Sequence, residues 1–345
     1  MPPPDSIPEA SSAAEQVRPG TRLGDFTIVR KLGDGGMGCV FLAQQLSLDR
    51  PVAVKVIAPQ IAADREHVLR FVREMRLTAQ LDHPGIVSAV DAGEAEGVYY
   101  LAMAYIQGET LQERVRRCGA LPEKEALQVG RAVAVALQYA WGKRLLLHLD
   151  VKPGNIMLTA DGGIKLMDLG LAQVAENAGC PRPLGPALGT PQYISPEQAR
   201  GDRALDFRSD VYSLGATLYY ALTGERPFPE ATPREAIDLH CNGPVPNPRR
   251  RNPRVSEATA VLVQRLMAKS PEARAADWGE VVAALGLLSA SGPEVTAPVP
   301  AHHPVLPRQW EPVLTAWASH PWYALAVVAA LLGLIVLLLL VLLLT

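Results

Sequence analysis

The most informative stretch of this sequence is His148-Leu149-Asp150-Val151-Lys152-Pro153-Gly154-Asn155, together with the later Asp168-Leu169-Gly170. It places a carboxylate, an ammonium, an amide and a second carboxylate on two short loops. This set of groups suits in-line phosphoryl transfer from a metal–nucleotide complex. Taken singly, each residue could equally be a turn former, because Asp, Asn and Gly favour turns. The other motifs of the chain decide between the two interpretations.

A glycine-rich segment, Gly33-x-Gly35-Gly36-x-Gly38-x-Val40, lies between two predicted strands. Such glycines form a hairpin whose backbone N–H groups can approach a phosphate closely. The pattern alone is a weak signal, and a plain tight hairpin explains it equally well. A dinucleotide-binding fingerprint would need a helix directly afterwards, whereas Cys39–Gln45 has the composition of a strand.

Lys55 lies inside an apolar strand, where a lone ammonium is costly unless an anion meets it. The alternative is an edge-strand lysine that points to solvent. Glu74, on a helix predicted over Arg65–Leu81, could hold Lys55 against nucleotide phosphates. Because three arginines crowd the same helix, an ordinary surface glutamate is the alternative for Glu74.

Apolar periodicity divides the chain into an early part with strands and a later part with helices. Short β-branched or aromatic runs predict a small antiparallel sheet, with strands at Phe26–Leu32, Cys39–Gln45, Val52–Ile57, Val87–Asp91 and Val98–Tyr105. Helical spacing predicts Leu111–Val115, Glu123–Trp141, Asp210–Leu222, Ala258–Ala268 and Trp278–Leu288. A short strand is expected at Ile164–Leu166, directly before Asp168. The fold class is therefore α+β.

These motifs, in this order, make Phe26 to about Leu288 resemble a protein kinase domain. Within that family the chain is similar to the bacterial serine/threonine kinases of eukaryotic type, whose Gly-x-Gly-Gly-Met-Gly loop matches Gly33–Gly38. The resemblance implies a bilobal fold, with a small antiparallel β-sheet lobe that carries one regulatory helix and a larger, mostly helical lobe. It also implies ATP and Mg²⁺ as cofactors, with Mn²⁺ as a substitute, and Ser/Thr hydroxyls of proteins as substrates.

The resemblance assigns roles to individual residues. Asp150 would be the catalytic base, Lys152 would steady the γ-phosphate, and Lys55, paired with Glu74, would contact the α and β phosphates. Asn155 and Asp168 would hold the metal. The nucleotide would be bound by Leu32, Gly33, Gly35, Gly36, Gly38, Val40, Ala53, Lys55, Met103, Tyr105, Ile106 and Leu158, with Met103 as gatekeeper and Ala104–Ile106 as hinge.

Further matches concern architecture and the class of substrate. Ser195-Pro196-Glu197 resembles the motif that closes the activation segment, with Arg274 as the expected ion-pair partner of Glu197. Asp210 would tie the start of a buried helix to the catalytic-loop backbone. Thr190 would hydrogen-bond near Asp150 and Lys152, as in the serine/threonine branch. These features argue against a small-molecule kinase of related fold.

Leu149 departs from the family pattern, because most protein kinases carry an arginine there. In those kinases a phosphate on the activation loop neutralises the arginine and orders the loop. Leu149 has no charge, and Leu171–Gly189 contains no Ser, Thr or Tyr. We therefore expect a loop that is ordered without phosphorylation, helped by its prolines. The departure also leaves open a catalytically inactive kinase fold that serves as a signalling scaffold, although the catalytic residues are all present.

Composition limits the class and the partners of the protein. Of the 345 residues, 48% are hydrophobic, enough for a sizeable core, and a net charge of −2 argues against nucleic acid as a partner. The four cysteines form no C-x-x-C pair, so neither a zinc site nor a disulfide framework is indicated. The basic run Arg249-Arg250-Arg251 is a solvated surface loop by default, with anionic lipid contact as the alternative.

The last part of the chain carries an uncharged run, Tyr323–Leu344, that predicts a transmembrane helix. At about 1.5 Å per residue this helix is roughly 33 Å long, against a hydrocarbon core of about 30 Å.

The predicted domains are a disordered tail 1–20, a kinase domain 21–288 with lobes 21–105 and 106–288, a Pro-rich juxtamembrane linker 289–321 and a transmembrane helix 322–344. No signal peptide is indicated. We therefore expect a single-pass protein anchored C-terminally in the cell membrane, in contact with lipid, with its kinase domain in the cytoplasm and nothing beyond the membrane. A kinase dimer is a further expected arrangement.

Overall fold

The computed structural model describes residues 17–35, 38–57, 80–168, 173–174, 190–202, 204–229 and 231–291. Contacts divide the chain into two units, Met1–Gly292 and Pro293–Thr345, and all described residues belong to the first. The predicted helix Arg65–Leu81 therefore lies almost entirely outside the described residues, as do most of the predicted linker and the whole predicted transmembrane helix 322–344. Among the helices that the structure does describe, none is both long and apolar enough to cross a membrane.

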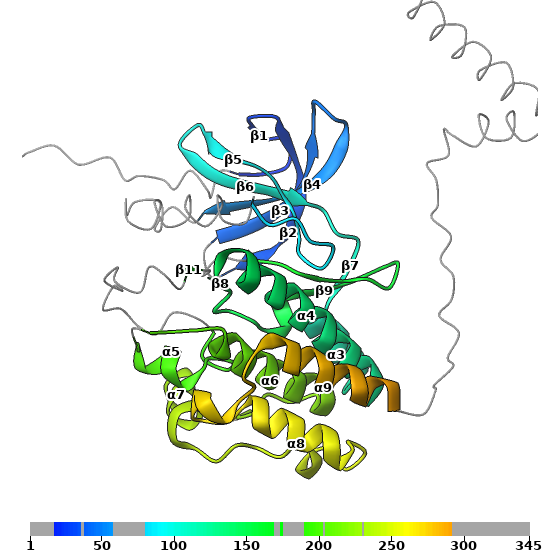
Figure 1. The fold of residues 1–345 in the computed structure, drawn as a ribbon. Helices are drawn as coiled ribbons and strands as arrows, with labels where there is room; N and C mark the ends of the chain where they lie inside the picture. Colours follow the sequence, from blue (N-terminus) through cyan, green and yellow to red (C-terminus); the bar gives the residue numbers. More distant parts are fainter. Residues whose placement is uncertain are drawn as a thin grey trace, which may run out of the picture. The chain divides into compact units, whose positions relative to one another are not determined.

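The N-terminal lobe is an antiparallel sheet, as the sequence predicts, and it has six strands (Figure 1). Its strands lie side by side in the order β1-β2-β3-β4-β6-β5, and each pairs antiparallel with its neighbours. Their bounds are β1 Arg22–Leu23, β2 Phe26–Gly35, β3 Gly38–Gln45, β4 Arg50–Ile57, β5 Ala89–Ala95 and β6 Val98–Ala104. All five predicted strands are present, with shifted ends, and β1 is an addition.

The two faces of this sheet have different surroundings. One face packs Phe26, Phe41, Val54 and Ala102 into a core of its own. Val17 joins this core and is only 8% exposed, so the packed chain begins before the boundary predicted at residue 21. Because directly opposed residues of antiparallel strands share a face, the register places the remaining central side chains together on the other face.

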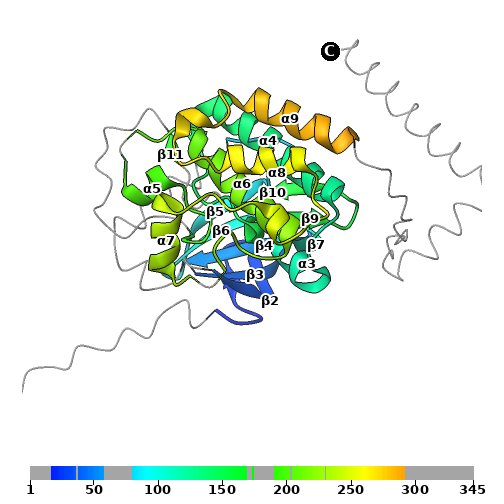
Figure 2. The same cartoon turned by 90° about the horizontal axis from the view of Figure 1, so that it is seen from below.

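The C-terminal lobe is built from helices around one almost fully buried helix, α6. The helices are α3 Leu111–Cys118, α4 Glu123–Arg144, α5 Pro196–Arg200, α6 Arg208–Thr223, α7 Pro233–Asn242, α8 Glu257–Leu266 and α9 Trp278–Ser291, with 3₁₀ turns η2 Pro153–Asn155, η4 Pro248–Arg250 and η5 Pro271–Ala273. In Figure 2, α9 runs alongside α4, and these two helices contact each other closely. The five helices predicted in this lobe are present, and α5 and α7 are additions.

Gly215 explains how closely α6 packs against its neighbours. A Cβ atom at this position would lie 2.8 Å from Leu266 Cβ and 2.9 Å from Met267 Cγ. Since Cβ atoms do not approach other heavy atoms so closely, a side chain here would push α6 away from the end of α8. Glycine at this position therefore lets the middle of α6 lie against the end of α8.

Short strands connect the helices and position the two loops of the opening motif. They are β7 Gly108–Thr110, β8 Leu146–Leu147, β9 Ile156–Thr159, β10 Ile164–Leu166 and β11 Gln173–Val174. The first loop lies between β8 and β9, and the second begins at the end of β10. Leu166 joins the lobes, because its N–H donates to Gly85 O at 2.8 Å and its C=O accepts from Val87 N at 2.9 Å.

Candidate active site

One buried carboxylate, that of Asp210, binds the backbone of the catalytic loop. Asp210, in the first turn of α6, accepts hydrogen bonds from the backbone N–H groups of His148 and Leu149, both at 2.8 Å. The predicted tie between Asp210 and this loop is therefore confirmed. Burial raises the pKa of Asp210, although the two N–H donors and the neighbouring His148 act in the opposite direction.

The carboxylate of Asp150 is surrounded by donors. Lys152 Nζ lies 2.6 Å from Oδ2, and the Thr190 hydroxyl donates to Oδ1 at 2.7 Å, with the Thr190 N–H at 3.1 Å. Lys152 Nζ also donates to the Thr190 hydroxyl oxygen at 2.8 Å. The predicted position of Thr190 is thus confirmed. The three residues form a closed set that fixes the direction of the Asp150 carboxylate.

Asn155 connects this set to the second loop. Its Nδ2 donates to Asp150 O at 2.9 Å and to Asp150 Oδ2 at 3.2 Å. Its backbone C=O accepts from Met167 N at 2.9 Å, directly before Asp168. Because Nδ2 is used in this way, the side-chain atom of Asn155 that remains for a ligand is Oδ1.

Lys55 and Asp168 form an ion pair between the two lobes. Lys55 is only 5% exposed, so this anion compensates the ammonium that the apolar strand buries. Burial works to raise the pKa of the Asp168 carboxyl, but the charge and hydrogen bond of Lys55 outweigh it, and the pKa lies below its ordinary value. Asp168 also has φ +60, a left-handed conformation. Glu74, the predicted partner of Lys55, lies outside the described residues.

The sheet face opposite the core of the N-terminal lobe carries four of the predicted nucleotide-binding side chains. Val40 pairs with Lys55, and Ala53 pairs with Met103. These four side chains alternate with the buried residues of β3, β4 and β6, so they share this second face. At the glycine-rich turn Gly33 pairs with Val40 and Gly35 with Gly38, while Gly36 is outside the described residues. Leu32 is 37% exposed at a bulge of β2.

The segment after β6 leads into the C-terminal lobe. Tyr105 and Ile106 are half-buried between β6 and β7. Leu158 of β9 pairs with Glu109 of β7, and a Cβ atom on Gly108 would come within 2.1 Å of the Leu158 carbonyl oxygen. Only glycine therefore lets the chain after the hinge run so close to Leu158.

The end of the activation segment is fixed by a buried ion pair. Both guanidinium Nη atoms of Arg274 contact Glu197, at 2.7 and 2.9 Å, and the Ser209 hydroxyl donates to Glu197 at 2.7 Å. The predicted pairing of Glu197 with Arg274 is confirmed. Burial acts to raise the pKa of Glu197, but the Arg274 bond and charge hold it below its usual range.

The sequence did not indicate two further contacts of the catalytic loop. His148 accepts from the Asp150 N–H through Nδ1 at 3.3 Å, and its Nε2 lies 3.2 Å from Met167 O. Gln198, on α5, donates from Nε2 to the Leu149 carbonyl at 2.7 Å. Leu149 itself is 3% exposed and has φ +62.

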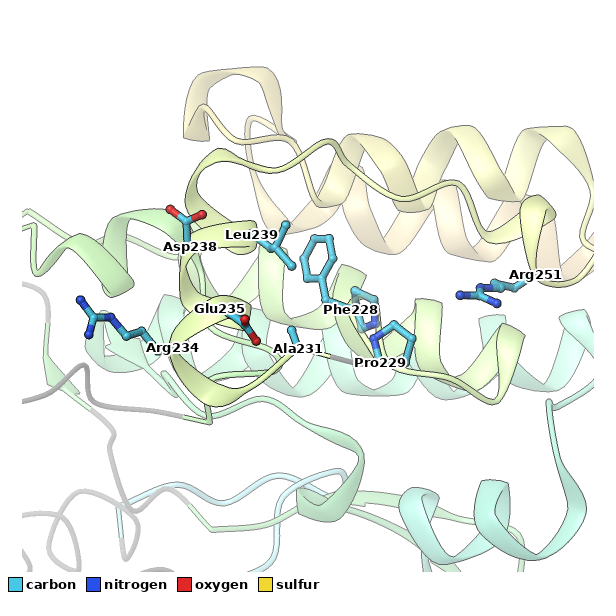
Figure 3. Close-up of a pocket in the computed structure, with 9 residues that line it drawn as sticks. Phe228, Pro229, Ala231, Arg234, Glu235, Asp238, Leu239 and Arg251 are labelled. Carbon is cyan, nitrogen blue, oxygen red and sulfur yellow. The ribbon is translucent and has the colours of Figure 1, made fainter.

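A cavity of about 630 Å³ lies elsewhere, beside α7. Figure 3 shows Phe228, Ala231 and Leu239 gathered near its centre, with Arg234 and Asp238 on the α7 side. Its lining shares no residue with the predicted site. This cavity therefore does not locate the reactive groups of the chain, whereas the hydrogen bonds around Asp150 do.

Comparison with known proteins gives a consistent result. Residues 26–284 match the family described as "Protein kinase domain". The chain is 40% identical over 257 residues to serine/threonine-protein kinase PknB of Mycobacterium leprae, covering 73% of this chain and 40% of that protein. It is 37% identical over 248 residues to serine/threonine-protein kinase PrkC of Bacillus subtilis, covering 72% and 38%. The chain thus spans about two fifths of the length of these curated relatives.

Solved structures agree with this match. The crystal structure of the Mycobacterium tuberculosis PknI kinase domain aligns with a TM-score of 0.64 at 31% identity, and the alignment covers 79% of this chain and 99% of that one. The similarity thus extends over both lobes of the described fold.

Proposed function

This chain belongs to the protein kinase domain family, and from that premise we propose that it transfers the γ-phosphate of ATP to Ser or Thr hydroxyls of proteins. One observation carries the proposal: Asp150 Oδ1 accepts from Thr190, while Lys152 bridges Asp150 Oδ2 and the same threonine. A serine or threonine hydroxyl that reaches this carboxylate can lose its proton there as its oxygen attacks the γ-phosphorus of ATP. The bond from that phosphorus to the β–γ bridging oxygen breaks in the same step, and ADP leaves. The names of the relatives, serine/threonine-protein kinases, support the same class of substrate.

Each charged residue of the site has a role in this proposal. Asp150 orients the substrate hydroxyl and takes its proton. The ammonium of Lys152, 2.6 Å from Asp150, lies where it can neutralise charge on the transferred phosphoryl group. Lys55, held by Asp168, contacts the remaining phosphates. Glu74 would complete this arrangement as the second partner of Lys55.

The residues present suit Mg²⁺ and a nucleotide. Asn155 Oδ1 and the Asp168 carboxylate are oxygen ligands of the type that Mg²⁺ prefers, and they would hold the metal together with phosphate oxygens and water. When bound, the metal offsets charge on the phosphates. The lowered pKa of Asp168 keeps this ligand ionised at neutral pH. Val40, Ala53 and Met103 on the sheet, with Leu158 on β9, provide the apolar surfaces for adenine.

We further propose that activity does not require phosphorylation of the activation loop. Leu149 is buried, its N–H is bonded to Asp210 and its C=O to Gln198. The backbone of the catalytic loop is therefore held by buried contacts within the chain, from Asp210 and Gln198, at the position where an arginine would need a phosphate. The sequence Leu171–Gly189 also offers no hydroxyl to phosphorylate.

The membrane location belongs to the proposal as well. The uncharged run Tyr323–Leu344 supports a C-terminal anchor with the kinase domain on the cytoplasmic side. Fractionation of cells that express the full chain tests this: alkaline carbonate should leave the protein in the membrane pellet. Release into the supernatant would contradict the anchor.

Incubation of the full chain with Mg-ATP and a basic acceptor protein tests the activity. We expect phosphate on Ser and Thr, and loss of transfer in Asp150→Asn and Asp168→Asn. If transfer is absent from the wild type and unaffected by either substitution, the chain is a scaffold with a kinase fold. Phosphatase treatment should change the rate less than twofold, whereas a drop of about tenfold or more, traced to a site between Asp168 and Thr190, would contradict independence from loop phosphorylation.

A further inference from the structure

The peptide group that joins Leu149 to Asp150 is held at both of its polar atoms. Its carbonyl oxygen accepts from Gln198 Nε2 at 2.7 Å, in a buried position. Its N–H donates to His148 Nδ1 at 3.3 Å. The plane of this peptide sets the direction in which the Asp150 side chain leaves the backbone, because ψ of Leu149 and φ of Asp150 are the rotations on either side of it.

Gln198 is itself held in place. It is 5% exposed, and its backbone N–H donates to the Ser195 hydroxyl, the N-cap of α5, at 3.2 Å. The preceding residue, Glu197, is fixed by two contacts from the guanidinium of Arg274. The amide of Gln198 therefore projects from a short helix that two buried residues hold, and it is a rigid support for the carbonyl that it contacts.

The Leu149 backbone needs such support. With φ +62, Leu149 adopts the left-handed conformation that is unfavourable for a residue with a Cβ. Asp210 holds the N–H of Leu149 at 2.8 Å, but it does not touch the carbonyl. Without the Gln198 amide, the Leu149–Asp150 peptide could rotate toward a relaxed conformation while the Asp210 contacts stayed intact. Asp150 would then turn away from Lys152 and Thr190.

We propose that Gln198 is a positioning residue, which couples the end of the activation segment to the catalytic carboxylate Asp150 through the Leu149 carbonyl. The coupling uses one neutral hydrogen bond, so it needs neither a charge at position 149 nor a phosphate. This inference rests on the proposed kinase activity. It explains how the position of α5 sets the orientation of the catalytic base Asp150.

The test compares Gln198→Met with Gln198→Glu in the full chain. Methionine keeps the size and flexibility of the side chain but has no donor, and glutamate has the same length but no N–H when ionised. We expect kcat to fall about 10- to 100-fold in both, since the carbonyl loses its donor. KM for ATP should stay within about twofold, because the nucleotide-binding face lies on other strands.

Ser209→Ala is the matched control, since it removes one buried hydrogen bond from Glu197 but leaves both Arg274 contacts and the Gln198 amide in place. Its kcat should stay within about threefold of the wild type even if its melting temperature falls as far as that of Gln198→Met. An unchanged kcat in Gln198→Met, or an equal loss in Ser209→Ala, would overturn the positioning role. Wild-type activity is measured first, so failure of the proposed function is recognised separately.

Hydrogen exchange supplies a readout that needs no activity. Below the melting temperature of every variant, Gln198→Met should accelerate amide exchange in the peptide that covers His148–Val151 by about tenfold, and Ser209→Ala should not. If exchange in this peptide is the same in wild type and Gln198→Met, the Gln198 amide does not hold the loop. This arm decides the inference even for a chain that transfers no phosphate.

Discussion

The guanidinium of Arg274 holds the carboxylate of Glu197 through two nitrogen–oxygen contacts, of 2.7 and 2.9 Å, with 0% and 7% of the two side chains exposed. Arg274 also donates from Nη1 to the Arg208 carbonyl at 2.7 Å and from Nε to the Ala268 carbonyl at 2.8 Å. One side chain thus joins α5, the start of α6 and the segment that follows α8. The end of the activation segment is consequently part of the helical core.

Arg274→Met should destabilise the protein strongly. Removal of the cation leaves Glu197 buried without its partner, which costs about 3–5 kcal/mol, or on the order of 10 °C in melting temperature for a domain of this size. Arg265→Met is the control, because its pair with Glu280 has side chains 48% and 37% exposed and should be worth less than about 1 kcal/mol. If both variants lower the melting temperature by the same amount, the Arg274–Glu197 pair does not stabilise the protein more than an exposed ion pair does.

Thr190→Val should lower kcat without unfolding the protein. The side chain of valine has nearly the same shape but cannot donate to Asp150 or accept from Lys152, while the backbone N–H keeps its bond to Asp150. Hydrogen bonds to charged groups are worth about 1.5–3 kcal/mol. That range corresponds to a loss of about 10- to 100-fold in rate. Thr190→Ser keeps the hydroxyl and should retain most of the activity. Steady-state phosphate transfer measures the difference. Equal activity of the valine and serine variants would contradict the prediction.

Leu149→Arg should not restore a phosphate switch; it should damage the core. Leu149 is 3% exposed among apolar side chains of the helical lobe, and an unpaired guanidinium there costs several kcal/mol. Leu149→Met, which conserves volume and apolarity, should cost less than about 1.5 kcal/mol. Urea unfolding of both variants measures the difference. An arginine variant as stable as the methionine variant would show that position 149 can reach solvent.

The sequence predicts the strands and long helices because their apolar periods are strong. Helix α7 is missing from the prediction for a physical reason: only Ala236 and His240 of it are buried, so its apolar period is weak. Thr232 and Glu235 nevertheless form a capping box around Pro233, a start signal that could have revealed it.

Some contacts of the candidate active site could likewise be predicted from the sequence, and others could not. The contacts of Asp210, Thr190 and Arg274 are predictable because the family resemblance assigns partners to those residues. The bond from Gln198 to Leu149 is not, since it joins a side chain to a backbone carbonyl that any residue at position 149 would present. Such a contact leaves no pattern in residue types, and only the folded chain brings the two positions together.

His240 makes the stability of the helical lobe depend on pH. Burial lowers the pKa of this histidine to about 4. His240 packs against Phe228, Tyr212 and the ammonium of Lys269. The Tyr212 hydroxyl lies 2.9 Å from its Nδ1. Unfolded, the imidazole takes up its proton near pH 6.5. Between pH 6.5 and 4 the unfolded chain therefore binds more protons, and the free energy of unfolding falls as the pH falls, by up to about 3 kcal/mol. Above pH 6.5 this histidine does not make the free energy of unfolding depend on pH.

His240→Gln keeps a polar group beside Tyr212 but does not titrate, so it isolates this contribution. Carboxylates such as Glu197, whose pKa is lowered in the folded state, also lose stability in acid, and they do so equally in both proteins. We therefore expect the variant to be less stable than the wild type at pH 7.5, where only packing differs, and to recover part of that deficit by pH 4.5. Urea unfolding at both pH values measures the difference. If the deficit is the same at pH 7.5 and 4.5, His240 accepts its proton as readily in the folded lobe as in the unfolded chain, and burial does not control its titration.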